Sequence, residues 1–119
     1  MTTLTKQLLS GSTNGKPIKV AATATAGTLI HTAVGSTSGA DLMYLWVSNN
    51  SGSAATLTLE WGGVTDPDDL LTKGLSIPAN SGPVQVAFGQ PVNNGLVLRG
   101  FSGTADVLHI TGYANRVLQ

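Results

Sequence analysis

The chain has 119 residues, of which only 10% are charged, and six Lys and Arg side chains balance six Asp and Glu side chains. Soluble domains usually carry about 25% charged residues, so this surface must consist mainly of Thr, Ser, Asn and Gly, and the length suits one domain with one core. The lack of cysteine excludes disulfide frameworks, thiolate metal sites and cysteine nucleophiles, and the dispersed basic residues provide no stripe for nucleic acid.

Charge and hydropathy also indicate the cellular compartment and the partners of the chain. No run approaches the roughly 20 apolar residues of a membrane span, and the first residues lack the basic start and long apolar run of a secretory signal. We therefore expect a protein made in a cytoplasm, with no nucleic acid and no membrane as partner. A net charge of zero leaves little repulsion between copies. This favours a subunit that packs against others, although a secreted module can have a similar surface.

The first ten residues differ from the rest of the chain. Leu4, Leu8 and Leu9 stand there among Thr, Lys and Gln, and a polar, Gly-containing turn follows. We interpret residues 1–10 as an N-terminal arm or edge strand and residues 11–119 as a single β-sandwich domain.

An extended path resumes after this turn. Lys16–Val20 reads as extended chain, and Pro17 restricts it to a strand start or a sheet edge. Thr28–Val34 is the next candidate strand, and the Gly- and Ser-rich residues 35–39 form a flexible connection.

The most informative stretch begins at Leu42–Val47, a strand that is apolar on both faces. One face carries Leu42, Tyr44 and Trp46, and the other carries Met43, Leu45 and Val47. Such a strand must be covered twice. The domain's own core covers one face, and the other face is covered by more of the same chain or by a neighbouring molecule.

Ala55–Trp61 follows after the turn residues Asn49–Ser53. Apolar residues alternate strictly with Thr56, Thr58 and Glu60, so one face is expected to meet the core and the other to meet water. We predict that this strand and Leu42–Val47 form a β-hairpin.

The second half of the chain continues in short strands and turns. The polar residues 66–69 predict a loop, and 70–77 is ambiguous between a strand and irregular packing. The remaining expected elements are a half-buried strand with Val84, Val86 and Phe88 on one face, a hairpin turn at Asn93–Gly95, and strands at Leu96–Phe101 and Val107–Ala114. Together these patterns predict seven or eight short strands in an all-β, antiparallel β-sandwich or jelly roll.

Few residues offer catalytic or metal chemistry. His31 and His109 lie in predicted strands with no acidic neighbour in sequence, so we interpret both as structural. Asp66, Asp68 and Asp69 are interpreted as a solvated turn whose carboxylates cap backbone amides, with Ca²⁺ binding as the alternative. We predict no enzyme activity, no catalytic residue, no metal and no cofactor.

Three segments share a distinctive style of sequence: Leu8–Val20, the Ala- and Thr-rich stretch that follows it to Thr32, and Trp46–Gly63. In this style the chain resembles the small decoration or cement proteins of tailed-bacteriophage capsids. The resemblance implies a structural protein of the virion, on the capsid exterior, assembled in the host cytoplasm. It also implies two partners, the major capsid protein and further copies of the chain in a homodimer or homotrimer.

The predicted subunit or capsid contacts are apolar residues outside the expected core. They are Leu4, Leu8 and Leu9 in the arm, Tyr44 and Trp46 on the second face of the central strand, and Val117 and Leu118 after the last strand. A receptor-binding or carbohydrate-binding β-sandwich module is the alternative function, because it would share the fold and the polar surface. Sugar platforms need several exposed rings, whereas Trp61 belongs to an expected core face.

Overall fold

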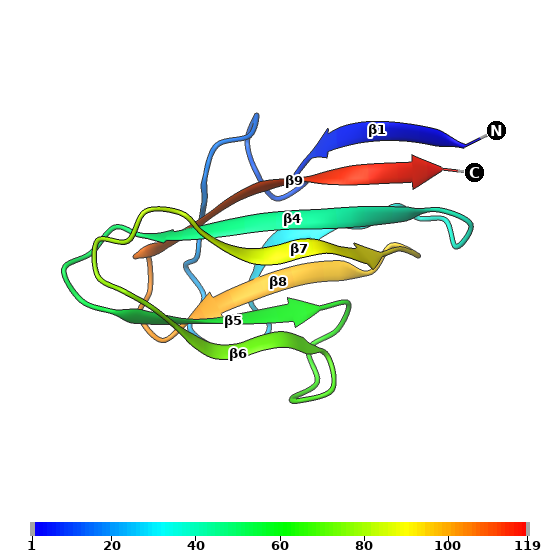
Figure 1. The fold of residues 1–119 in the computed structure, drawn as a ribbon. Coiled ribbons are helices and arrows are strands. Elements are labelled where there is room, and N and C mark those ends of the chain that lie inside the picture. The colour runs from blue at the N-terminus through cyan, green and yellow to red at the C-terminus, as the bar shows by residue number, and fades with distance from the viewer. Residues whose placement is uncertain (1, 119) are drawn as a thin grey trace.

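The computed structural model describes residues 2–118, which form nine strands in two antiparallel sheets packed face to face (Figure 1). Sheet A has the order β1-β9-β4-β7, with β2 also paired to β9, and sheet B has the order β3-β8-β5-β6. The strands are β1 (Thr3–Leu8), β2 (Ile18–Lys19), β3 (Thr28–Thr32), β4 (Ala40–Asn49), β5 (Ala55–Trp61), β6 (Leu70–Ile77), β7 (Val84–Val92), β8 (Val97–Ser102) and β9 (Leu108–Leu118).

This architecture confirms the predicted all-β antiparallel sandwich. The strand count is nine rather than seven or eight, because the ambiguous segment 70–77 forms a full strand and the first residues add β1. Residues 2–118 include no helix that is long and apolar enough to cross a membrane.

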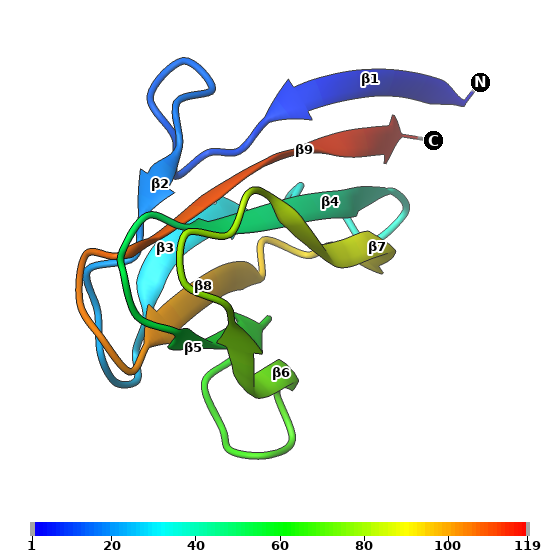
Figure 2. The same ribbon diagram turned by 60° about the vertical axis from the view of Figure 1, so that its left-hand side comes forward.

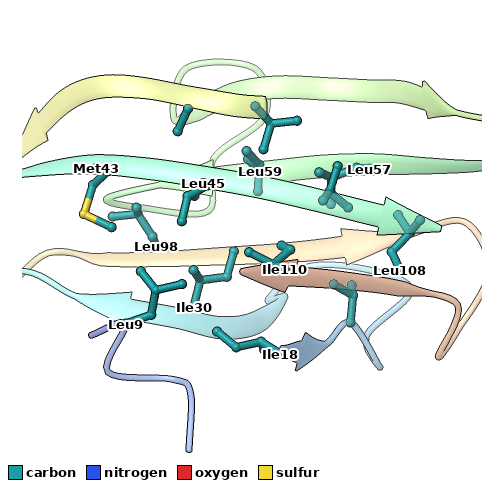
Figure 3. Close-up of a cluster of buried hydrophobic side chains, with 14 of the residues drawn as sticks. Leu9, Ile18, Ile30, Met43, Leu45, Leu57, Leu59, Leu98, Leu108 and Ile110 are labelled. Atoms are coloured by element: carbon teal, nitrogen blue, oxygen red, sulfur yellow. The ribbon is translucent and has the colours of Figure 1, made fainter. Parts of the chain in front are cut away.

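The core lies between the two sheets and is filled by alternate residues of their strands (Figure 3). Met43 and Leu45 of β4 are fully buried, and Figure 3 shows Met43 beside Leu98 of β8 and Leu45 beside Leu59 of β5. Each such side chain stabilises the fold by roughly 1.5–3 kcal/mol on burial. The inward face of the central strand and the core face of Ala55–Trp61 are therefore as predicted.

The predicted hairpin between β4 and β5 is wrong. The two strands belong to different sheets, so the connection crosses from one layer of the sandwich to the other. Asn49 ties the end of β4 to this connection and to β6: its buried side-chain amide donates hydrogen bonds to the carbonyls of Ser53 and Ile77, at 2.9 and 3.1 Å. The turn at Asn93–Gly95 likewise has the expected positive φ angles but joins β7 to β8 in the opposite sheet.

The outward face of β5 is open to water, as predicted, only at Thr56. Thr58 is 5% exposed and Glu60 is 1% exposed. The segment between β2 and β3 covers Glu60, whose carboxylate accepts hydrogen bonds from the Thr25 hydroxyl and from the Gly27 amide. The hydroxyl oxygen of Thr58 accepts one from the Gly74 amide at 3.0 Å.

Strand β7 also departs from its predicted pattern. Its pairing with β4 shifts register twice, so the alternation of Val84, Val86 and Phe88 does not keep them on one face. Val86 and its neighbour Ala87 are buried, whereas Val84 is exposed and Phe88 is 64% exposed. The bulges thus turn an aromatic ring outward.

A buried charged cluster joins the two sheets at one end of the core. Asp41 Oδ2 lies 2.7 Å from His31 Nε2, and Arg116 Nε and Nη2 donate to the two Asp41 oxygens at 2.8 and 3.0 Å. The Ser10 amide donates to His31 Nδ1, so the neutral imidazole donates from Nε2. His31 therefore has an acidic neighbour in space, although it has none in sequence.

The electrostatics of this cluster favour the ionised form of Asp41. Burial alone would raise the pKa of Asp41, but hydrogen bonds from Arg116 and His31 outweigh it and hold the pKa below the ordinary value of 3.8. The hydrogen bond to Asp41 in turn raises the pKa of Arg116. A carboxyl group with a lowered pKa adds stability above its ordinary pKa, and this stability is lost as pH falls through the folded-state pKa.

We expect Asp41→Asn to lower the free energy of unfolding by about 3–5 kcal/mol at neutral pH, because it breaks a buried ion pair. The difference from the wild type should shrink as pH falls below 3.8, the ordinary pKa of the group, because the Asp41 carboxylate of the unfolded wild type then takes up a proton before that of the folded protein. Urea unfolding followed by circular dichroism at a series of pH values measures this. An equal difference at neutral pH and at about pH 2.5 would contradict it.

Candidate assembly surface

The outer face of sheet A is the face turned away from the core, and the strand register shows which side chains share it. Leu8 of β1 is opposite Tyr113 of β9, which is opposite Tyr44 of β4, which in turn is opposite Phe88 of β7. Directly opposite residues of paired strands point to the same side. The larger apolar side chains of the outer face of sheet A are therefore Leu4, Leu8, Leu42, Tyr44, Trp46, Phe88, Tyr113 and Val117.

The aromatic rings of this face pack on one another. Tyr44 and Tyr113 stack with ring centroids 5.2 Å apart and 21° between their planes, and Trp46 lies 6.1 Å from Tyr113. Lys6 Nζ lies 4.4 Å from the centroid of the Tyr113 ring, which is a cation–π distance. Gly89, at φ 91°, leaves room for the Tyr44 ring, since a Cβ there would lie 2.9 Å from the Tyr44 hydroxyl.

Much of this face remains open to solvent. Leu4, Leu8 and Phe88 are 65%, 60% and 64% exposed, and the rings between them are half-buried. Among residues 2–118, the register assigns no Asp or Glu to the outer face of sheet A. A large apolar face with so little charge is typical of a surface that contacts another protein.

Five of the predicted contact residues come together on this face, namely Leu4, Leu8, Tyr44, Trp46 and Val117. The first residues form the paired edge strand β1, and Val117 and Leu118 lie within β9, not after the last strand. Leu118 follows the alternation to the opposite face and is 36% exposed.

Leu9 does not belong to this surface. The sequence placed it outside the reach of the core, and that expectation is wrong, since its side chain is 3% exposed and packs in the core cluster. The chain bends into the sandwich after Leu8, where the Leu9 carbonyl accepts hydrogen bonds from the amide and hydroxyl of Ser12.

Phe88, Tyr113 and Lys6 also belong to this surface, although the sequence did not predict them there. Their pairing with β4 and β9 brings them to it. A usable signal was present for Tyr113, because it alternates with Thr111 and Asn115 on the polar side of a strand. No such signal was present for Phe88, because alternation places Phe88 on the same face as Val86. The bulges of β7 turn the Phe88 side chain to the opposite face.

The other candidate sites lie elsewhere. Asp66 pairs with Lys73 at 2.9 Å, and Asp69 accepts a hydrogen bond from the Thr65 amide, which is the capping role expected for this loop. His109 contacts Asn50 on the surface. Within residues 2–118, no three His, Asp or Glu side chains gather closely enough to hold a metal ion.

A cavity of about 330 Å³ lies on the outer side of sheet B, between the segment 23–25 and strands β5 and β6. Glu60, Thr58, Lys73 and Phe101 are among its lining residues. The buried pair of His31 and Asp41 is not part of this lining. One aromatic ring among the lining residues is fewer than a sugar platform of several stacked rings would use.

Comparison of the chain with protein-family models, with curated proteins and with solved structures gave no match.

The structure separates two neighbouring leucines by role. Leu8→Ala should change the free energy of unfolding by less than about 0.5 kcal/mol, because the side chain is largely exposed. Leu9→Ala should lower it by about 2–5 kcal/mol, because it leaves a cavity in the core. Chemical denaturation of both variants measures this, and equal losses would show that Leu9 is not a core residue.

Proposed function

We propose that this protein is a structural subunit of a virion, a decoration or cement protein that binds across junctions between major capsid protein subunits. The observation that carries the proposal is the outer face of sheet A, on which three aromatic rings pack together beside exposed leucines and a fourth ring. The resemblance in sequence style to capsid decoration proteins supplies the identity of the partner.

Such a protein acts through buried area and not through a reaction. A specific contact of standard size buries about 800 Å² on each partner, which is a modest part of the 5897 Å² surface of this chain. Contact with two neighbouring capsid subunits at once would resist their separation. No covalent step or cofactor is needed for this role, and we propose none.

The charge distribution supports a role in assembly. Both buried carboxylates, Asp41 and Glu60, are engaged in internal hydrogen bonds that hold segments of the chain in place. Few charges are left to keep copies or partners apart. We infer that the protein acts on the capsid exterior after assembly in the host cytoplasm, with the major capsid protein and further copies of itself as partners.

The test uses capsids assembled from the major capsid protein encoded in the same genome. The wild-type protein should co-sediment with these capsids, and a Phe88→Ser, Trp46→Ser double variant should bind at least tenfold more weakly, because apolar contact area is lost. The variant should remain folded, since both side chains lie outside the core.

Leu75→Ser is the matched control, because Leu75 is an exposed leucine on β6 of the other sheet. It should bind capsids as the wild type does. If the wild-type protein does not bind capsids but binds specific sugars on a glycan array, the proposal is overturned. The protein would then be a carbohydrate-binding or receptor-binding module.

A further inference from the structure

Strand β1 is the edge of sheet A and has a partner on one side only. It pairs antiparallel with β9, from Thr3 opposite Leu118 to Leu8 opposite Tyr113. Its other side faces away from the sandwich (Figure 2). Every residue of β1 is exposed except the half-buried Gln7, and the backbone N–H and C=O groups of alternate residues point away from β9 with no partner strand.

Natural proteins usually protect such an edge with proline, a bulge or projecting charges. β1 contains no proline, and its register with β9 runs without a shift. Its one charged side chain, Lys6, lies over the Tyr113 ring and is thereby directed back over the sheet. The edge is therefore unprotected, and Leu4 and Leu8 stand beside it at 65% and 60% exposure.

We propose that β1 pairs antiparallel with β1 of a second copy of this chain, about a two-fold axis perpendicular to sheet A. The two five-stranded sheets would then form one continuous sheet. The inference rests on the proposed function in that it names the second copy as one of its partners, and it chooses the homodimer over the homotrimer because an edge-to-edge pairing of this kind closes with two copies.

The charge on Lys6 favours an axis at Thr5 over one at Lys6. A two-fold axis perpendicular to the sheet leaves each residue on the same face in both copies. Because opposite residues of paired strands share a face, the axis must pass beside a residue that lies opposite the same residue of the second copy. An axis at Lys6 would place two lysines opposite each other, and like charges at directly opposite positions are destabilising. An axis at Thr5 places two threonines opposite each other and sets Leu4 against the stem of Lys6, which can cover it.

The dimer also enlarges the apolar outer face of sheet A, which we propose as the contact surface. Because the axis is perpendicular to the sheet, the outer faces of both copies point the same way. Two sets of Leu4, Leu8 and Tyr113 then lie on either side of the axis. An edge of six residues buries less area than most stable interfaces. We therefore expect a dissociation constant in roughly the micromolar range for the dimer.

The absence of cysteine from the chain permits a direct test of this geometry in the full-length protein. Opposite residues of paired strands have Cα atoms about 4.5–5.5 Å apart, within the range that a disulfide bridges. Thr5→Cys should therefore give a covalent dimer under mild oxidation, at least tenfold faster than Thr104→Cys, in which an exposed threonine of the β8–β9 loop is replaced.

A second measurement follows the unmodified interface. Sedimentation of the wild type at tens of micromolar should show dimers of twice the 12.1 kDa chain mass. Leu4→Lys should shift the protein to monomer by adding charge at the edge, while Leu75→Lys should leave the dimer intact. Circular dichroism confirms that the variants keep the β-sandwich.

A monomeric wild type at high micromolar concentration, with no faster crosslinking of Thr5→Cys than of Thr104→Cys, would overturn the inference. A trimer would overturn it as well. Capsid binding by such a monomer or trimer would leave the proposed function standing, whereas a dimer crosslinked at Thr5 that fails to bind capsids would confirm the pairing and remove the proposed function.

Discussion

The antiparallel pairing of β4 with β9 over ten residues is the interaction on which the rest of the structure depends. Both strands have neighbours in sheet A on either side, so their register sets the facing of the whole sheet. It directs Met43 and Leu45 into the core and places Tyr44 opposite Tyr113 on the outer face. A shift by one residue would exchange these faces, turning Tyr44 inward and exposing Met43 and Leu45.

Two of the six acidic side chains, Asp41 and Glu60, are buried and hold the fold together. Asp41 links β4 to His31 of sheet B and to Arg116 of β9, and Glu60 holds the segment around Thr25 over sheet B. Among residues 2–118, every buried side-chain nitrogen and oxygen has a hydrogen-bond partner. The buried charges thus position loops and strands, and the outer face of sheet A is left apolar.

That apolar face and the open edge of β1 belong to one continuous region of the molecule, because Leu8 and Lys6 of β1 adjoin the Tyr113 ring. Pairing at the edge would therefore extend the same surface that we propose contacts the capsid. The cavity near Glu60 lies on the opposite sheet, and it is independent of this arrangement.

The sequence by itself determined the all-β class, most strand positions and the core face of Ala55–Trp61, because these follow from alternation and turn chemistry between near neighbours. It also indicated that the strand Leu42–Val47 has two apolar faces. Tertiary structure alone decided which sheet each strand joins, the burial of Leu9 and Glu60, and the cluster in which Asp41 meets an arginine 75 residues away. These features depend on contacts between segments that are far apart in the chain. Such contacts cannot be predicted from the alternation of apolar and polar residues within one segment.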